Sequence, residues 1–208
     1  AQAAAEQAAL EQIPENSANV QAAVVSIDNA TGGVRAMVGG RDFLVSEVNV
    51  AMRRRQSGSS VKMFILAAAM EAGLLPDDVI DGTLPCLLPN PGDDREPTFL
   101  ISNGVSRPTA SLRTMTALSI NCAYARLSQV VGLEKVVALM YGMMSSDFLP
   151  KPVWGTDAER LNLIKPYASL STGANELSPL DMASGAQTIA NFGVHHEPYL
   201  VEKIEDST

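Results

Sequence analysis

The most restrictive feature of this 208-residue chain is an apolar run from Met63 to Met70 (MFILAAAM). A helix built from it would have no hydrated face, and a helix that is apolar on all sides belongs in the interior of a domain. The run is also far shorter than the roughly 20 residues that a membrane-spanning helix needs. We therefore expect a buried core helix from about Ser59 to Ala72.

Two polar side chains, Ser59 and Lys62, stand at the start of this buried helix. Side chains three residues apart lie on one face of a helix, so the lysine amine can reach the serine hydroxyl. A neutral amine could take the serine proton, and burial lowers the pKa of a lysine toward that state. Ser60 is a poorer nucleophile candidate because its partner three residues on is Met63. The four residues alone fit a helix cap followed by a first-turn lysine equally well.

Ser119-Ile120-Asn121 is a second candidate motif. A serine hydroxyl and an asparagine amide on one short turn can relay a proton and hold a peptide carbonyl. Ser17-Ala18-Asn19 has the same pattern, and we interpret that copy as a turn before a strand. Only the order of the motifs and their context separate the two copies.

Along the chain, the pattern predicts a few strands and several helices. Helices are expected over residues 1–13, 59–72, 111–131 with an interruption near 119–121, 133–144 and 178–192. Strands are expected over residues 20–28 and 34–38, paired as an antiparallel hairpin, and over 197–206, with short strands in the proline-rich stretch 76–109. This order predicts an α+β or α/β fold, an antiparallel sheet flanked by helices with an inserted all-helical lobe.

Charge and composition exclude several functions. A formal net charge of −8 argues against nucleic-acid binding, which needs a basic surface. His195 and His196 are adjacent and would point to opposite faces of a strand, so no metal site is expected. Two cysteines do not make a disulfide scaffold, and a Cys86–Cys122 bond in an oxidising compartment stays one of two alternatives, the other being free thiols. We expect any membrane anchor to lie outside this chain.

Four blocks of sequence together resemble the transpeptidase domain of class A penicillin-binding proteins. They occur in the family's order: VRAMVGGRDF at 34–43, RRQSGSSVK at 54–62, ALSIN at 117–121, and the segment 178–206. Penicillin-binding proteins and class A β-lactamases share the motif set Ser-x-x-Lys, Ser-Asp-Asn and Lys-Thr-Gly. The resemblance covers most of the chain and implies a β-lactamase/transpeptidase-like fold.

The resemblance also implies a role for each matched residue. Ser59 would be acylated by a peptidoglycan stem peptide ending in D-Ala-D-Ala, and an acceptor amine would then take the acyl group. Lys62 would be the base, Ser119 would pass a proton to the leaving amine, and Asn121 would hold the substrate amide. β-Lactams would trap Ser59. No cofactor is implied, and the domain would work outside the cytoplasm, in the periplasm or on the outer face of the cytoplasmic membrane.

The sequence departs from the family in one serious respect: it contains no Lys-Thr-Gly. Ser171-Thr172-Gly173 lacks the cation and precedes the helix that should come before that motif. Smaller departures are Ser57 and Met63, where the family usually has proline. We therefore expect residues 1–208 to be a partial transpeptidase domain with an incomplete sheet. Its C-terminal strands would be absent or on a second chain, and it would be unstable and inactive without them.

Two other classes of function fit parts of the pattern. A penicillin-binding sensor or non-catalytic scaffold would stay acylated or would not react. A serine β-lactamase would share Ser59 and Lys62 but would need a carboxylate to activate water. Glu159 is present, although its surroundings do not match a β-lactamase and surface charge explains it better.

Overall fold

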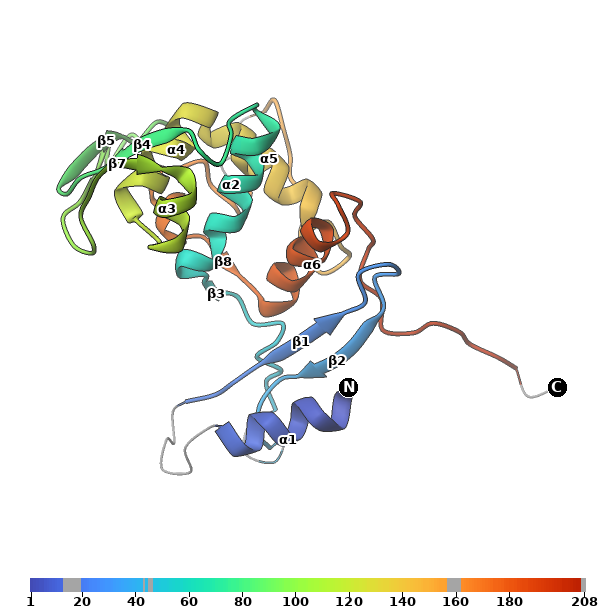
Figure 1. The fold of residues 1–208 in the computed structure, drawn as a ribbon. Coiled ribbons are helices and arrows are strands. Elements are labelled where there is room, and N and C mark those ends of the chain that lie inside the picture. The colour runs from blue at the N-terminus through green and yellow to red at the C-terminus, as the bar shows by residue number, and fades with distance from the viewer. Residues whose placement is uncertain (13–19, 43, 45–46, 157–161, 207–208) are drawn as a thin grey trace. The chain divides into compact units, whose positions relative to one another are not determined.

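The computed structural model describes residues 1–12, 20–42, 44, 47–156 and 162–206. The chain divides into two compact units (Figure 1). The first contains residues 1–55, 142–150 and 177–208, and the second contains residues 56–141 and 151–176. Strands β3 (Arg55–Gln56) and β8 (Glu176–Leu177) lie where the chain passes from one unit to the other.

The first unit begins with a helix and a β-hairpin, as predicted. Helix α1 spans Gln2–Gln12, and strands β1 (Val24–Ile27) and β2 (Val34–Val38) pair antiparallel. The turn between the strands is held by Asp28, whose carboxylate accepts hydrogen bonds from the backbone N–H groups of residues 30 and 31. Strand β1 is shorter than the predicted 20–28, because pairing with β2 begins only at Val24.

Helix α6 (Pro179–Ala190) starts where the Ser-Pro signal predicts and ends two residues before the predicted Phe192. Its first turn is a capping box. The Ser178 hydroxyl accepts from the backbone N–H of Asp181, and the Asp181 carboxylate accepts from that of Ser178. Each side chain satisfies a backbone donor that the helix leaves free.

The strand predicted over 197–206 is wrong. Only Tyr199 pairs, through an isolated parallel bridge to Gly33, and residues 200–206 are exposed without regular structure. The apolar residues of this stretch satisfy the strand pattern, but Ile204 is 90% exposed. A strand needs a neighbouring edge to satisfy its backbone groups, and within the described residues this one meets such an edge at one position only.

The second unit holds the predicted buried helix and the short strands expected in the proline-rich stretch. These strands form two antiparallel pairs, β4 with β7 and β5 with β6. The elements are η1 (Gly58–Val61), α2 (Lys62–Glu71), β4 (Val79–Gly82), β5 (Cys86–Pro89), β6 (Thr98–Ile101), β7 (Arg107–Ser111), α3 (Leu112–Ala117), α4 (Asn121–Val131), α5 (Leu133–Met143) and η3 (Ala168–Thr172).

Helix α2 lies in the core of the second unit, where it packs against α4 and η3. Phe64, Ile65 and Ala69 on it are completely buried, which confirms the interpretation of the apolar run. The architecture is the predicted mixture of helices and antiparallel strands, and its sheet is incomplete. The strands form small two-stranded sheets in place of one large sheet.

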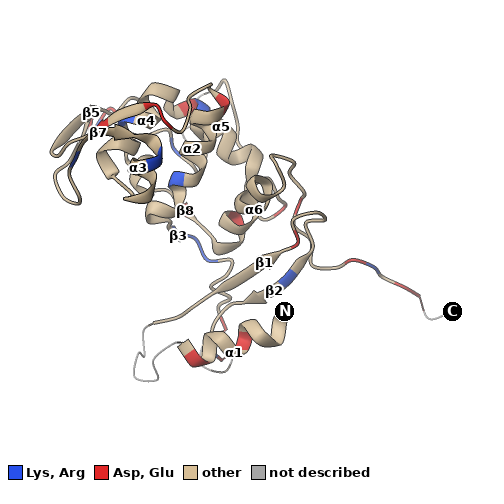
Figure 2. Ribbon diagram, in the orientation of Figure 1, with Lys and Arg blue, Asp and Glu red and all other residues tan. Residues whose placement is uncertain are grey.

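No helix among the described residues is long and apolar enough to cross a membrane. Figure 2 shows acidic and basic residues on helices and connections of both units.

Candidate active site

The candidate nucleophile and base lie on consecutive turns of the second unit. Ser59 sits in the 3-10 turn η1 and is exposed, whereas Lys62 is the first residue of α2 and only 5% exposed. The Lys62 Nζ is 3.1 Å from the Ser59 Oγ. The neighbouring Ser60 instead donates its hydroxyl proton to the backbone oxygen of Ser57 at 2.6 Å. Of the two serines, Ser59 is therefore the one in contact with an amine.

Lys62 also reaches the second motif. Its Nζ lies 2.7 Å from the Ser119 backbone oxygen, 2.9 Å from the Ser119 Oγ and 2.7 Å from the Asn121 Oδ1. The backbone and amide oxygens can only accept, whereas the two hydroxyls can donate or accept. A neutral amine has two protons for those two oxygens, and its lone pair then faces a hydroxyl. The site can thus hold Lys62 uncharged, with its two protons donated to the acceptor-only oxygens and its lone pair accepting from one of the two hydroxyls.

Burial lowers the pKa of Lys62 from 10.5 to about 8. The cause is desolvation, which disfavours the charged ammonium. No carboxylate forms an ion pair with Lys62 within the described part of the chain, so no such ion pair raises the pKa of the amine again. Near neutral pH an appreciable fraction of the amine is free to accept a proton.

The second motif lies in a break between α3 and α4, where the sequence predicts one. Ser119 has a φ of 52°, a left-handed backbone conformation that is uncommon outside glycine. The turn is anchored by Ile120, which is completely buried and donates its backbone N–H to the oxygen of Met115 at 3.0 Å. Strand β4 passes this anchor at Gly82, where a Cβ would lie 2.6 Å from the Ile120 side chain.

Asn121 is the first residue of α4, and a loop between β6 and β7 approaches its amide. A Cβ on Gly104 of that loop would lie 3.4 Å from the Asn121 Nδ2, and the φ of Gly104 is +119°. A side chain here would be strained and would touch the amide. A glycine at this position keeps the space beside Asn121 open.

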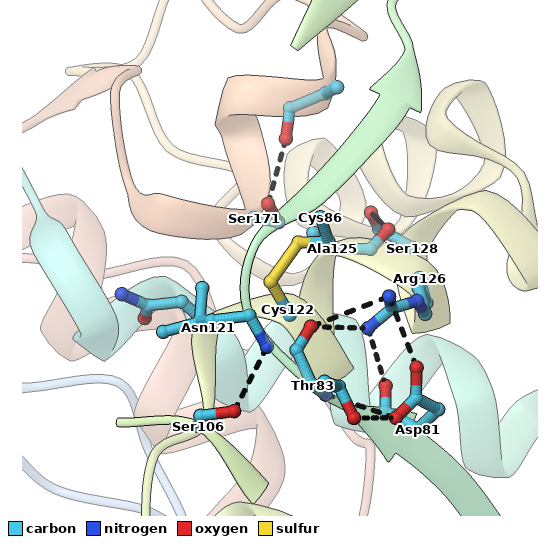
Figure 3. The surroundings of a disulfide bond; sticks show 12 residues. Asp81, Thr83, Cys86, Ser106, Asn121, Cys122, Ala125, Arg126, Ser128 and Ser171 are labelled. Carbon is cyan, nitrogen blue, oxygen red and sulfur yellow. Dashed lines mark hydrogen bonds and ion pairs between the residues drawn. A yellow bond between two sulfur atoms is a disulfide. The ribbon is translucent and has the colours of Figure 1, made fainter. Parts of the chain in front are cut away.

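A disulfide joins Cys86 of β5 to Cys122, the residue that follows Asn121 (Figure 3). This decides between the two alternatives that the sequence leaves open. Further along α4, Arg126 forms an ion pair with the Asp81 carboxylate at 3.1 Å and donates to the Asp81 backbone oxygen at 2.8 Å. Helix α4, which carries Asn121, is thus fastened to the strands by a covalent bond and an ion pair.

The segment Ser171-Thr172-Gly173, which is not the third motif, supports the nucleophile turn from behind. A Cβ on Gly173 would lie 2.1 Å from the backbone oxygen of Gly58, directly before Ser59. The Gly58 N–H points at the Gly173 oxygen at 3.4 Å. Ser57, where the family usually has proline, has a φ of −75°, which proline also adopts.

The structure brings Ser59, Lys62, Ser119 and Asn121 together as the family resemblance implies, and it adds residues that the motifs do not contain. Gly173 and Arg126 have no signal in the sequence, because their roles depend on contacts across the fold. The other Ser-x-Asn copy at 17–19 lies outside the described residues, and so does Glu159. Within the described ranges, no group of His, Cys, Asp or Glu side chains could hold a metal ion.

An exposed serine, a buried amine and a second serine within hydrogen-bond distance suit serine acyl transfer. They define the class of Ser-x-x-Lys acyltransferases. Residues 22–208 match the family described as "Penicillin binding protein transpeptidase domain". The chain therefore belongs to the penicillin-binding protein transpeptidase family.

Similar proteins support this assignment. The chain is 33% identical over 190 residues to penicillin-binding protein 1A of Aquifex aeolicus, which covers 90% of the chain and 24% of that protein. The crystal structure of penicillin-binding protein 1A from Haemophilus influenzae has a TM-score of 0.71 at 28% identity, covering 88% of this chain and 25% of that one. PonA1 from Mycobacterium tuberculosis in complex with penicillin V has a TM-score of 0.72 at 28% identity, covering 95% and 50%. The chain spans about a quarter of the curated relative's length.

Proposed function

We propose that this chain provides the Ser-x-x-Lys part of a D,D-transpeptidase that cross-links peptidoglycan stem peptides. The observation that carries the proposal is the single buried amine of Lys62, which contacts the Ser59 hydroxyl, the Ser119 hydroxyl and the Asn121 amide oxygen. A penicillin-binding sensor needs only the acylated serine. The second hydroxyl on the same amine favours an enzyme, because it provides a path for a second proton transfer.

In the acylation step, the Ser59 Oγ attacks the carbonyl carbon of the D-Ala-D-Ala peptide bond while its proton moves to the neutral Lys62 amine. The Ser59 backbone N–H would donate to the oxyanion that forms. The carbon–nitrogen bond then breaks. The leaving amine of the terminal D-Ala receives a proton through the Ser119 hydroxyl, which Lys62 resupplies.

In the second half of the reaction, the deacylation step, these proton transfers occur in reverse. An acceptor amine from a neighbouring stem attacks the Ser59 ester and gives up a proton through Ser119 to Lys62. The ester bond breaks, and the Ser59 oxygen takes the proton back. Asn121 is proposed to hold the substrate amide by its Nδ2, because its Oδ1 is occupied by Lys62. The products are a cross-linked peptide and the regenerated serine.

The complete site requires a second oxyanion donor and a cation for the substrate carboxylate. Lys-Thr-Gly, which supplies them in the family, does not occur in residues 1–208. We propose that C-terminal strands outside these residues, or on another chain, provide it and complete the sheet. We also propose an extracytoplasmic location, where stem peptides and β-lactams meet this site.

The test is to label the protein with a fluorescent penicillin, using the longest form of the protein that carries these residues. Wild type and Ser60→Ala should be labelled, and Ser59→Ala should not. Ser60→Ala is the matched control because it removes a neighbouring exposed hydroxyl that donates to the Ser57 backbone oxygen and not to Lys62 in the described part of the chain. An unlabelled wild type, or a labelled Ser59→Ala, refutes the proposal. Label that is rapidly lost from the wild type indicates a hydrolase.

A further inference from the structure

A buried tyrosine lies behind the Lys62 amine, and the proposed reaction does not use it. Tyr124 is on α4, three residues after Asn121, so the two side chains project from the same side of that helix. It is only 2% exposed. The Lys62 Nζ is 5.4 Å from the centre of the Tyr124 ring, within the range of a cation–π contact.

The tyrosine hydroxyl is fixed by a second contact. The Tyr124 Oη is 2.7 Å from the Thr116 Oγ1, and Thr116 donates its only hydroxyl proton to the backbone oxygen of Leu112 at 2.7 Å. The tyrosine must therefore be the donor to Thr116. This bond joins α3 to α4 across the break that carries Ser119, whose left-handed backbone is otherwise unfavourable.

The hydroxyl thus fixes the position of the Tyr124 ring, and the face of the ring lies toward the Lys62 amine. We propose that Tyr124 is a positioning residue of the transpeptidase site, whose ring holds the Lys62 amine between the two serine hydroxyls and whose hydroxyl fixes the Ser119 turn. The proposal rests on the function proposed above. According to this proposal, the ring acts on the Lys62 amine and the hydroxyl acts on the Ser119 turn, so different variants can measure the two effects.

The ring acts on the charge of Lys62 in one direction. The negative face of an aromatic ring favours the ammonium, whereas burial favours the neutral amine. The other described groups that contact the Lys62 amine come from η1, the α3–α4 turn and the first residue of α4, and they are two hydroxyls, a backbone carbonyl and an amide. Since none of them titrates near neutral pH, a change in the titration of Lys62 on removing the ring is assigned to the ring.

Three variants separate the two effects. Tyr124→Leu removes both ring and hydroxyl, whereas Tyr124→Phe keeps the ring and removes only the bond to Thr116. Thr116→Val removes the same bond from the other side, together with the bond from Thr116 to the Leu112 backbone oxygen. In Tyr124→Leu the Lys62 titration should move to lower pH by about 0.4 to 1.5 units. In the other two variants it should stay within about 0.2 units of wild type.

The primary readout is the titration of the Lys62 amine by nitrogen NMR, with Lys62→Met used to assign the signal. The pH dependence of penicillin acylation is the second. Tyr124→Phe and Thr116→Val should each slow acylation, and the double variant should be no slower than Thr116→Val alone, because that variant has already lost the bond to Tyr124. An unchanged titration in Tyr124→Leu, or an equal shift in Tyr124→Phe, overturns the role of the ring. Additive effects of Tyr124→Phe and Thr116→Val overturn the role of the hydroxyl.

The two readouts also distinguish this inference from the proposed function. A wild-type protein that does not react with penicillin refutes the transpeptidase proposal, yet the NMR titration still reports whether the ring acts on Lys62. A reactive wild type with an unshifted Tyr124→Leu titration refutes only the role of the ring.

Discussion

The bond between Cys86 and Cys122 should contribute strongly to the stability of the second unit. It closes a loop between residues 36 positions apart in the chain, and neither cysteine is free. A loop of that length lowers the conformational entropy of the unfolded chain by about 13 cal/mol/K, or roughly 4 kcal/mol at 25 °C. Both half-cystines are buried in a cluster with Ile101 and Ala125, so packing around them adds to this effect.

The measurement is urea unfolding with and without a thiol reductant. Reduction of the wild type should lower the free energy of unfolding by about 4 kcal/mol. The double variant Cys86→Ala with Cys122→Ala should be as unstable as the reduced wild type, within about 1 kcal/mol, and should not respond to reductant. That variant is the control for effects of the reductant elsewhere.

A loss below about 1 kcal/mol in the reduced wild type would refute the loop-closure argument. Thiol titration of the denatured, unreduced protein gives an independent check. It should find no free thiol, and two free thiols per chain would show that the bond does not form.

Three further predictions concern Lys62 and the support behind Ser59. Penicillin acylation should rise with pH and level off above about 8, the pKa of Lys62, because only the neutral amine can accept the proton; a profile that falls through this range contradicts the assignment of the base. The folded state binds this proton more weakly than the unfolded chain, so unfolding experiments should show stability rising between about pH 8 and 10.5, and Lys62→Met should remove that rise. Gly173→Ala should destabilise the protein by about 1–3 kcal/mol and slow acylation, because its Cβ would overlap the Gly58 backbone. The control Gly73→Ala, which is also at positive φ but in open space, should lower thermal stability less and leave acylation unchanged. Equal effects of the two variants would contradict the reasoning.

The local elements of the second unit could be predicted because their signals lie within short windows. The apolar run defined α2, and the break at 119–121 separated α3 from α4. The spacing of Ser59 and Lys62 gave their contact directly, because three residues make about one turn. The meeting of Lys62 with Ser119 needed the family's motif order, since no local rule joins residues 57 positions apart.

The remaining features depend on contacts that a window of sequence does not contain. The 197–206 segment has a strand pattern, but a strand forms only beside a partner edge, and pairing stopped at Tyr199. Gly173 reads as an ordinary turn glycine, and its contact with Gly58 appears only when η3 packs against η1. Tyr124 reads as a core residue, which it also is; its closeness to an amine depends on how α2 packs against α4.

The backbone conformation of Ser119 has a consequence for any effort to redesign this protein. A sequence chosen only to stabilise this fold would place glycine where Ser119 adopts a left-handed φ, and an apolar side chain where Lys62 is buried. Both changes would relieve local conflicts and raise thermal stability, and both would remove a group from the candidate site. Positions where the local preference of a residue opposes the fold are therefore the ones to hold fixed during stabilisation. In this chain two such positions are in hydrogen-bond contact with each other.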